Sequence, residues 1–133
     1  MTTVQPSLLL RRVLLADGLV SGATGLLMLL AADWLGAFLE LPRGLLFGAG
    51  LSLLPFAAAL FWLARRETLS RPLVWAVIAI NAVWVLDSLL LLVSGWVAPN
   101  LLGHAFVIAQ AVAVLAFAEL QWFGLKRSQP LLA

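Results

Sequence analysis

The sequence predicts an all-α fold, a transmembrane four-helix antiparallel bundle that forms one integral membrane domain over residues 1–133. Of its residues 64% are hydrophobic and only 11% are charged, whereas a soluble domain carries about a quarter charged residues. Four apolar runs reach the roughly 20 residues that a helix needs to cross the hydrocarbon core. Because these runs do not alternate and are too long for barrel strands, helices are the expected spanning elements.

We expect the spans at about residues 13–35, 44–64, 72–96 and 99–123. The first run exceeds the roughly 7 to 15 residues of a signal-peptide core, so we interpret it as a helix of the mature protein. Residues 36–43 are too few for a domain and too apolar for water, and we expect them in the headgroup region. The turn around Pro99 is tight, so the third and fourth spans should be antiparallel neighbours.

The distribution of basic residues predicts the topology. Four spans place both termini on one side of the membrane, and Arg43 is the only basic residue expected on the other side. Because cytoplasmic segments carry an excess of Lys and Arg, we expect both termini in the cytoplasm and the protein in a bacterial inner membrane. The basic residues on the terminal side are Arg11, Arg12, Arg65, Arg66, Arg71, Lys126 and Arg127.

Composition also limits the possible chemistry. The chain has no cysteine, which removes disulfides, thiolate metal sites and cysteine nucleophiles. His104 is the single histidine, and neither an HExxH motif nor a glycine-rich phosphate loop is present. The net charge is only +2 and the basic residues sit at span ends, so we expect no nucleic-acid binding. We therefore expect no metal, no cofactor and no catalytic residue.

The third span carries an unusual polar face. At about 100° per residue, Asn81, Trp84, Asp87 and Ser88 fall on one side of a helix. A carboxylate at the centre of a spanning helix costs roughly 2.5–3.5 kcal/mol on insertion scales, so Asp87 should be protonated, paired or facing water. We predict that any activity depends on Asp87. The other members of the predicted ligand or proton site are Asn81, Trp84, Gln110 and His104.

Depth along the spans predicts three polar pairs. The pairs are Asp17 with Glu119 near the cytoplasmic boundary, Asn81 with Gln110 near the midplane, and Asp87 with His104 toward the outer side. Each pair also has a structural interpretation. The amides can act as glue between helices, Asp87 can be a structural carboxyl, and the remaining groups can be solvated at the membrane boundary.

In overall plan the chain resembles the small four-helix integral membrane proteins of bacteria and, more distantly, the DoxX-like group. The segments that carry the resemblance are residues 16–22 around Asp17, 41–50 around Pro42, 81–84, and 118–124 around Glu119. The resemblance implies a four-helix bundle, and it implies no activity and no catalytic residue.

Three classes of function remain open. The first is a non-enzymatic membrane module that binds a small or lipid-like molecule, or a partner helix, at the polar face of the third span. The second is a proton-coupled transporter or channel for a small solute, and the third is an enzyme acting on a lipophilic substrate. Beyond the lipid bilayer, we expect a homo-oligomer, with a dimer favoured, because glycine and alanine recur at the spacing of close helix contacts.

Overall fold

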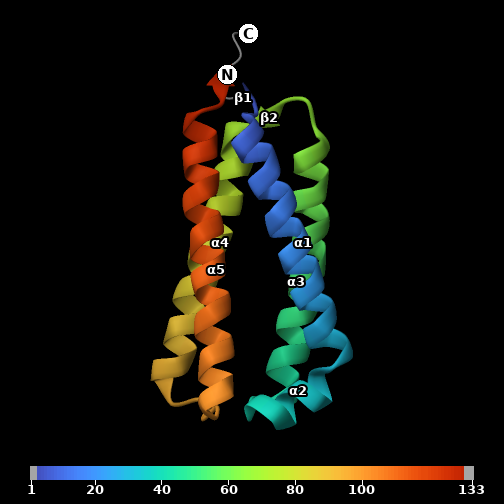
Figure 1. Ribbon diagram of the computed structural model, residues 1–133, viewed down its shortest axis with the longest axis vertical. Coiled ribbons are helices and arrows are strands. Elements are labelled where there is room, and N and C mark those ends of the chain that lie inside the picture. Colours follow the sequence, from blue (N-terminus) through green and yellow to red (C-terminus); the bar gives the residue numbers. More distant parts are fainter. Residues whose placement is uncertain (1–2, 131–133) are drawn as a thin grey trace.

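Four helices of the structure are long and apolar enough to cross a membrane, and they run alternately in opposite directions (Figure 1). In this computed structural model residues 3–130 are described. The predicted fold class, four antiparallel transmembrane helices, is confirmed. The spanning helices are α1 (Leu8–Leu30), α3 (Arg43–Arg65), α4 (Arg71–Ser94) and α5 (Leu101–Lys126).

The two ends of the bundle differ in what they contain. Both chain ends and the α3–α4 connection lie together at one end, which we call the terminal end (Figure 1). The short helix α2 (Ala32–Leu39) lies at the opposite end, which we call the α2 end. Large apolar side chains such as Leu19, Ile80 and Val112 are exposed along the spans. These outward faces therefore contact the lipid bilayer.

The first span begins earlier and ends earlier than the expected 13–35. Ser7 caps α1 by accepting a hydrogen bond from Leu10 N at 3.1 Å, so Arg11 lies inside the helix. The Arg11 guanidinium donates to the carbonyl oxygens of Ala64 at 2.6 Å and Arg66 at 2.9 Å. The last carbonyls of a helix lack intrahelical partners. Arg11 thus satisfies the end of α3 as well as carrying charge at the membrane boundary.

Helix α2 covers the end of the expected first span and the first half of the segment expected near the headgroups, residues 36–43. It buries Ala32, Leu35 and Leu39, and it exposes Trp34, whose ring stacks on Phe38 with centroids 5.1 Å apart. A short helix with one apolar buried face and exposed aromatic rings suits the membrane interface. Helix α2 therefore crosses the α2 end of the bundle as a separate element.

The spans associate as two hairpins. Helix α1 packs along α3, and α4 packs along α5, whereas α1 with α5 is the main contact between the pairs and α3 scarcely touches α4. In Figure 1 the spanning helices of the two hairpins meet at the terminal end and diverge toward the α2 end, where helix α2 contacts α5. Within the first hairpin, a Cβ atom built on Gly50 would lie 2.7 Å from Gly25 O. Glycine at both positions therefore permits the closest approach of α1 and α3.

A small antiparallel sheet closes the terminal end. Strand β1 (Thr3–Gln5) lies between β2 (Leu69–Ser70) and β3 (Gln129–Pro130), and Val4 is opposite both Leu69 and Pro130. Val4 is fully buried. The sheet was not expected from the sequence, and its backbone pairing joins three distant segments of the chain.

Candidate functional site

A buried carboxyl group joins three of the four spans. Asp17 Oδ1 accepts from Ser21 Oγ at 3.0 Å, and Oδ2 accepts from Asn81 Nδ2 at 2.9 Å and from Gln121 Nε2 at 2.7 Å. Asn81 Nδ2 also donates to Gln121 Oε1 at 2.9 Å. We call these four residues the Asp17 cluster. Asp17 and Gln121 have no exposed surface, so α1, α4 and α5 are connected by hydrogen bonds away from solvent.

Helical periodicity explains the composition of the Asp17 cluster. On α1 the buried residues Leu10, Leu14, Asp17 and Ser21 recur every three or four positions, which places the carboxyl on the face directed at the other hairpin. A carboxyl in such a position is costly unless its lone pairs are satisfied. Three neutral donors satisfy them here, which allows Asp17 to stay in the interior.

A second polar group lies within the α4–α5 hairpin. Trp84 Nε1 donates to Gln110 Oε1 at 2.6 Å, and Gln110 Nε2 donates to Ser88 Oγ at 2.9 Å and to Val107 O at 2.7 Å. Ser88 Oγ in turn donates to Trp84 O at 2.8 Å. The indole ring is therefore held in one orientation by the amide of the neighbouring helix.

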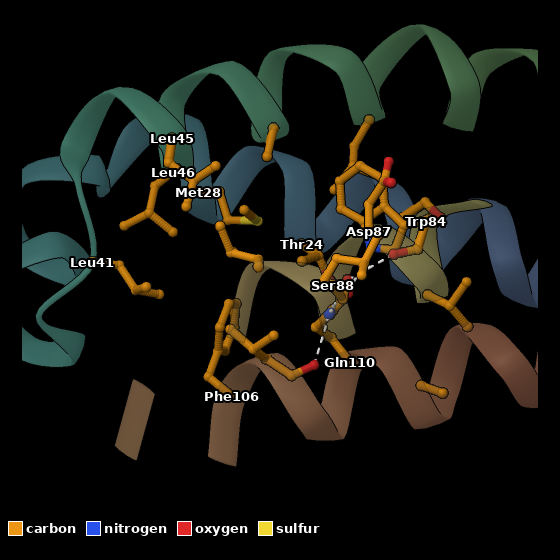
Figure 2. Close-up of a pocket in the computed structure, with 18 of the residues that line it drawn as sticks. Thr24, Met28, Leu41, Leu45, Leu46, Trp84, Asp87, Ser88, Phe106 and Gln110 are labelled. Carbon is orange, nitrogen blue, oxygen red and sulfur yellow. Dashed lines mark hydrogen bonds between the residues drawn. The ribbon is translucent and has the colours of Figure 1, made fainter. Parts of the chain in front are cut away.

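Between the hairpins lies a cavity of about 740 Å³ (Figure 2). This volume falls in the range of roughly 300–1,000 Å³ that is typical of ligand pockets. Ser21 of the Asp17 cluster contributes to its wall, and Leu41, next to α2, lines it as well. Exposed lining residues such as Val20 and Leu90 show that the cavity communicates with the surroundings of the bundle.

The cavity has a polar side and an apolar side. Figure 2 shows Trp84, Asp87, Ser88 and Gln110 gathered on one side. The labelled residues on the other side are apolar: Met28, Leu41, Leu45, Leu46 and Phe106. This division suits a molecule with an apolar body and one polar end.

The structure separates the predicted polar pairs. Asn81 contacts Asp17 and Gln121, whereas its expected partner Gln110 contacts Trp84 and Ser88. Heptad spacing keeps Asn81 and Ser88 on one buried face of α4. Asp87 is rotated about 100° from Ser88, and it stands at the edge of that face as an exposed residue of the cavity wall.

Glu119 does not join Asp17. It is exposed on α5, while Gln121 is buried in the Asp17 cluster. Two residues along a helix correspond to about 200° of rotation, so a helix that directs Gln121 inward directs Glu119 away. Asp17 and Glu119 were expected at a similar depth in the membrane, but they are not partners because their side chains point in different directions.

His104 lies apart from Asp87. It is exposed in the first turn of α5, where its Nδ1 is 3.1 Å from the O atom of Asn100, the N-cap of this helix. Gln110, which faces Ser88, is six residues further along α5, or about 9 Å at 1.5 Å per residue. His104 therefore belongs to the α2 end, and the structure does not place it in the cavity wall.

Sequence reasoning did not single out Gln121. A signal for it exists, because the buried positions of α5 recur at helical spacings: Val107, Ala111, Ala118, Gln121 and Leu125. Gln121 is also eleven residues, or about three turns, beyond Gln110. A polar residue within a buried stripe should have been matched with buried polar residues on the other spans.

The described residues contain no group of three or more His, Cys, Asp or Glu side chains that could hold a metal ion. Comparisons with protein-family models, with curated proteins and with solved structures give no match. The resemblance to the DoxX-like group therefore stays a prediction. Its coarser part, a small membrane protein with four helices of transmembrane length, agrees with the structure.

Proposed function

We propose that the protein is a non-enzymatic membrane module that binds a small lipophilic molecule in the cavity between its two hairpins. The observation that carries this proposal is the cavity itself, whose volume is about 740 Å³ and whose wall is mostly apolar, with Trp84, Asp87, Ser88 and Gln110 gathered on one side. Apolar pockets with a few oriented polar groups are the usual form of small-molecule sites. The fixed indole of Trp84 supplies a flat apolar surface for the ligand.

The terminal end of the bundle favours binding over transport. A solute that passed from the cavity to the terminal end would have to cross the Asp17 cluster and the apolar layer behind it. That layer includes Leu10, Leu14, Leu60 and Val74, each with at most 1% of its surface exposed. A binding module needs no passage through this layer. A proton-coupled transporter would need the two hairpins to separate at this layer during its cycle.

Mass spectrometry of the purified protein tests the binding proposal. The protein is extracted in a mild detergent, and molecules that remain bound are identified in the native complex. Ala113 is a half-buried residue of the cavity wall, and Ala116 is an exposed residue of the same helix that does not line the cavity. We expect Ala113→Phe to fill part of the cavity and lower the bound fraction, while Ala116→Phe leaves it unchanged.

The two variants make the result interpretable. Both add the same aromatic side chain to α5, so a general effect on folding or on detergent binding should appear in both. Retention of the molecule in Ala113→Phe at the wild-type level would contradict binding in the cavity. Equal loss in both variants would also contradict it, because the exposed position does not touch the cavity.

Self-association remains part of the proposal. Gly18, Gly22 and Gly25 of α1 face α3 inside the protein; a Cβ atom on Gly22, for example, would lie 3.5 Å from Ala57 Cβ. Ala105 and Ala109, one helical turn apart on α5, are both exposed, so this small-residue surface is free for close packing against a second copy. Cross-linking in native membranes should trap a dimer, and Ala109→Leu should reduce its yield. Recovery of monomer alone from the wild-type protein would argue against a dimer.

A further inference from the structure

Among the residues that the structure describes, Asp87 is the only ionisable one that lines the cavity. Its carboxyl group forms no hydrogen bond or salt bridge with residues 3–130, whereas its neighbours Trp84, Ser88 and Gln110 are hydrogen-bonded to one another. The wall of the cavity therefore contains one acidic group without a partner in the protein, next to neutral polar groups that are already hydrogen-bonded. The Asp87 carboxyl is therefore available to a ligand bound in the cavity.

The surroundings of Asp87 favour a cation as its partner. A carboxylate within a membrane is costly unless it is paired or hydrated. Trp84 lies beside Asp87 in the cavity wall, and aromatic rings attract ammonium groups. A cation at this place would meet a carboxylate beside an aromatic ring, whereas an anionic ligand would be repelled by Asp87.

The charge distribution of the α2 end points the same way. Within residues 3–130, this half of the molecule carries three acidic residues, Asp33, Glu40 and Asp87, and Arg43 is its one strongly basic residue. Arg43 is paired with Asp33, so it does not neutralise the cavity. The basic residues gather instead at the terminal end. A surface with an excess of negative charge concentrates cations near it.

We propose that the ligand of this cavity is a lipophilic amine, which places its ammonium group against the Asp87 carboxylate and its apolar body toward Met28, Leu46 and Phe106. This inference rests on the proposed binding function and names its substrate class. The apolar part lies along the side of the cavity shown at the left of Figure 2. A charged hydrogen bond between ammonium and carboxylate supplies the selectivity, and burial of the apolar chain supplies affinity.

Three probes of equal chain length test the inference: decylamine, decanol and decanoate. Each is titrated into the protein in lipid nanodiscs, and bound stoichiometry is read by native mass spectrometry. The wild-type protein should bind decylamine at least about tenfold more tightly than decanol, a difference of about 1.4 kcal/mol. Decanoate should bind most weakly.

Substitutions at Asp87 and at Ala113 distinguish the effect of the negative charge on binding from the effect of the cavity volume. Asp87→Asn keeps the size of the side chain and removes its negative charge, so decylamine and decanol should then bind with similar affinity. Ala113→Phe reduces the space available and should weaken both, while Ala116→Phe should weaken neither. Thermal unfolding of each variant verifies that it is folded.

The outcomes distinguish this inference from the binding function. If the wild-type protein binds decylamine and decanol equally, and Ala113→Phe still weakens both, the cavity binds lipophilic molecules but the amine selectivity is refuted. If the amine preference persists in Asp87→Asn, the role of Asp87 is refuted. If no probe binds, or if Ala113→Phe has no effect, the binding function fails and the inference fails with it.

Discussion

Asn81 Nδ2 lies 2.9 Å from Asp17 Oδ2, and this hydrogen bond connects the second hairpin to the first within the buried Asp17 cluster. The two residues are 64 positions apart in the chain. Together with Gln121 they provide polar contacts between hairpins whose helices α3 and α4 scarcely touch. The Asp17 cluster therefore holds together the layer that closes the cavity toward the terminal end.

Replacing Asn81 should destabilise the bundle. Asn81→Ala leaves Asp17 Oδ2 with Gln121 as its only interhelical donor, and it removes the donor to Gln121 Oε1. A buried polar group that loses a partner costs about 1–3 kcal/mol, and we expect a loss of that size in the free energy of unfolding. Ser52→Ala is the control, because Ser52 is exposed and bonds to Ala49 O of its own helix. Equal stability of Asn81→Ala and wild type would contradict the role of the Asp17 cluster.

Glycine is required at Gly50 but not at Gly48, two residues earlier on α3. A Cβ atom on Gly50 would lie 2.7 Å from Gly25 O and 2.9 Å from Leu29 N, both backbone atoms of α1. A Cβ atom on Gly48 would meet nothing within 4 Å. We expect Gly50→Ala to lower the free energy of unfolding by about 1–3 kcal/mol. Gly48→Ala should be neutral or stabilising by up to about 1 kcal/mol, because alanine favours a helix. Reversible unfolding in mixed micelles measures both, and a larger loss for Gly48→Ala would refute the packing of α1 on α3.

Glu40 ends α2 in a left-handed conformation, with φ of 54°. Non-glycine residues are disfavoured there because Cβ approaches the backbone. Glu40→Gly should stabilise the protein by about 1 kcal/mol. Glu40→Ala removes the same charge and retains the strained Cβ, so it should give no such gain. An equal gain from both substitutions would attribute the effect to charge instead of conformation.

The predicted topology can be tested with cysteines, because the chain has none of its own. Gln129 at the terminal end and Ala98 near the α2 end are both exposed. Single cysteines at these positions should react with a membrane-impermeant maleimide from opposite sides, with Gln129→Cys reached from the cytoplasm. Ser128 is a poorer site, because it is buried and its hydroxyl accepts from Ser7 N. Reaction of both cysteines from the same side would exclude four spans.

The sequence predicted the four spans because length and apolar composition decide whether a helix can cross a membrane. It also identified Asn81 and Trp84 as unusual residues of α4. It did not predict their partners, because these depend on how each helix is rotated and on where the hairpins cross. Asp17 illustrates this point: depth alone suggested Glu119, while the rotation of α5 brings Gln121 to it.

The short elements at the two ends were also beyond the sequence analysis. Strands β2 and β3 have two residues each, too few for any periodic pattern. Residues 32–39 were divided between the first span and the headgroup region, because apolar character continues through Trp34 and Leu35. The helix breaks at Ala31, where φ is −113°. No glycine or proline at this position indicates the break in the sequence.

Photochemical cross-linking tests the central claim, that a lipophilic molecule occupies the cavity between the hairpins. Decylamine carrying a diazirine in its chain is irradiated with the protein in nanodiscs, and the modified residues are located by peptide mass spectrometry. We expect modification of cavity-lining residues such as Thr24, Phe106 and Val114, suppressed by excess unlabelled decylamine. Modification confined to exposed residues such as Val112 and Leu115, and insensitive to competition, would contradict a ligand site in the cavity.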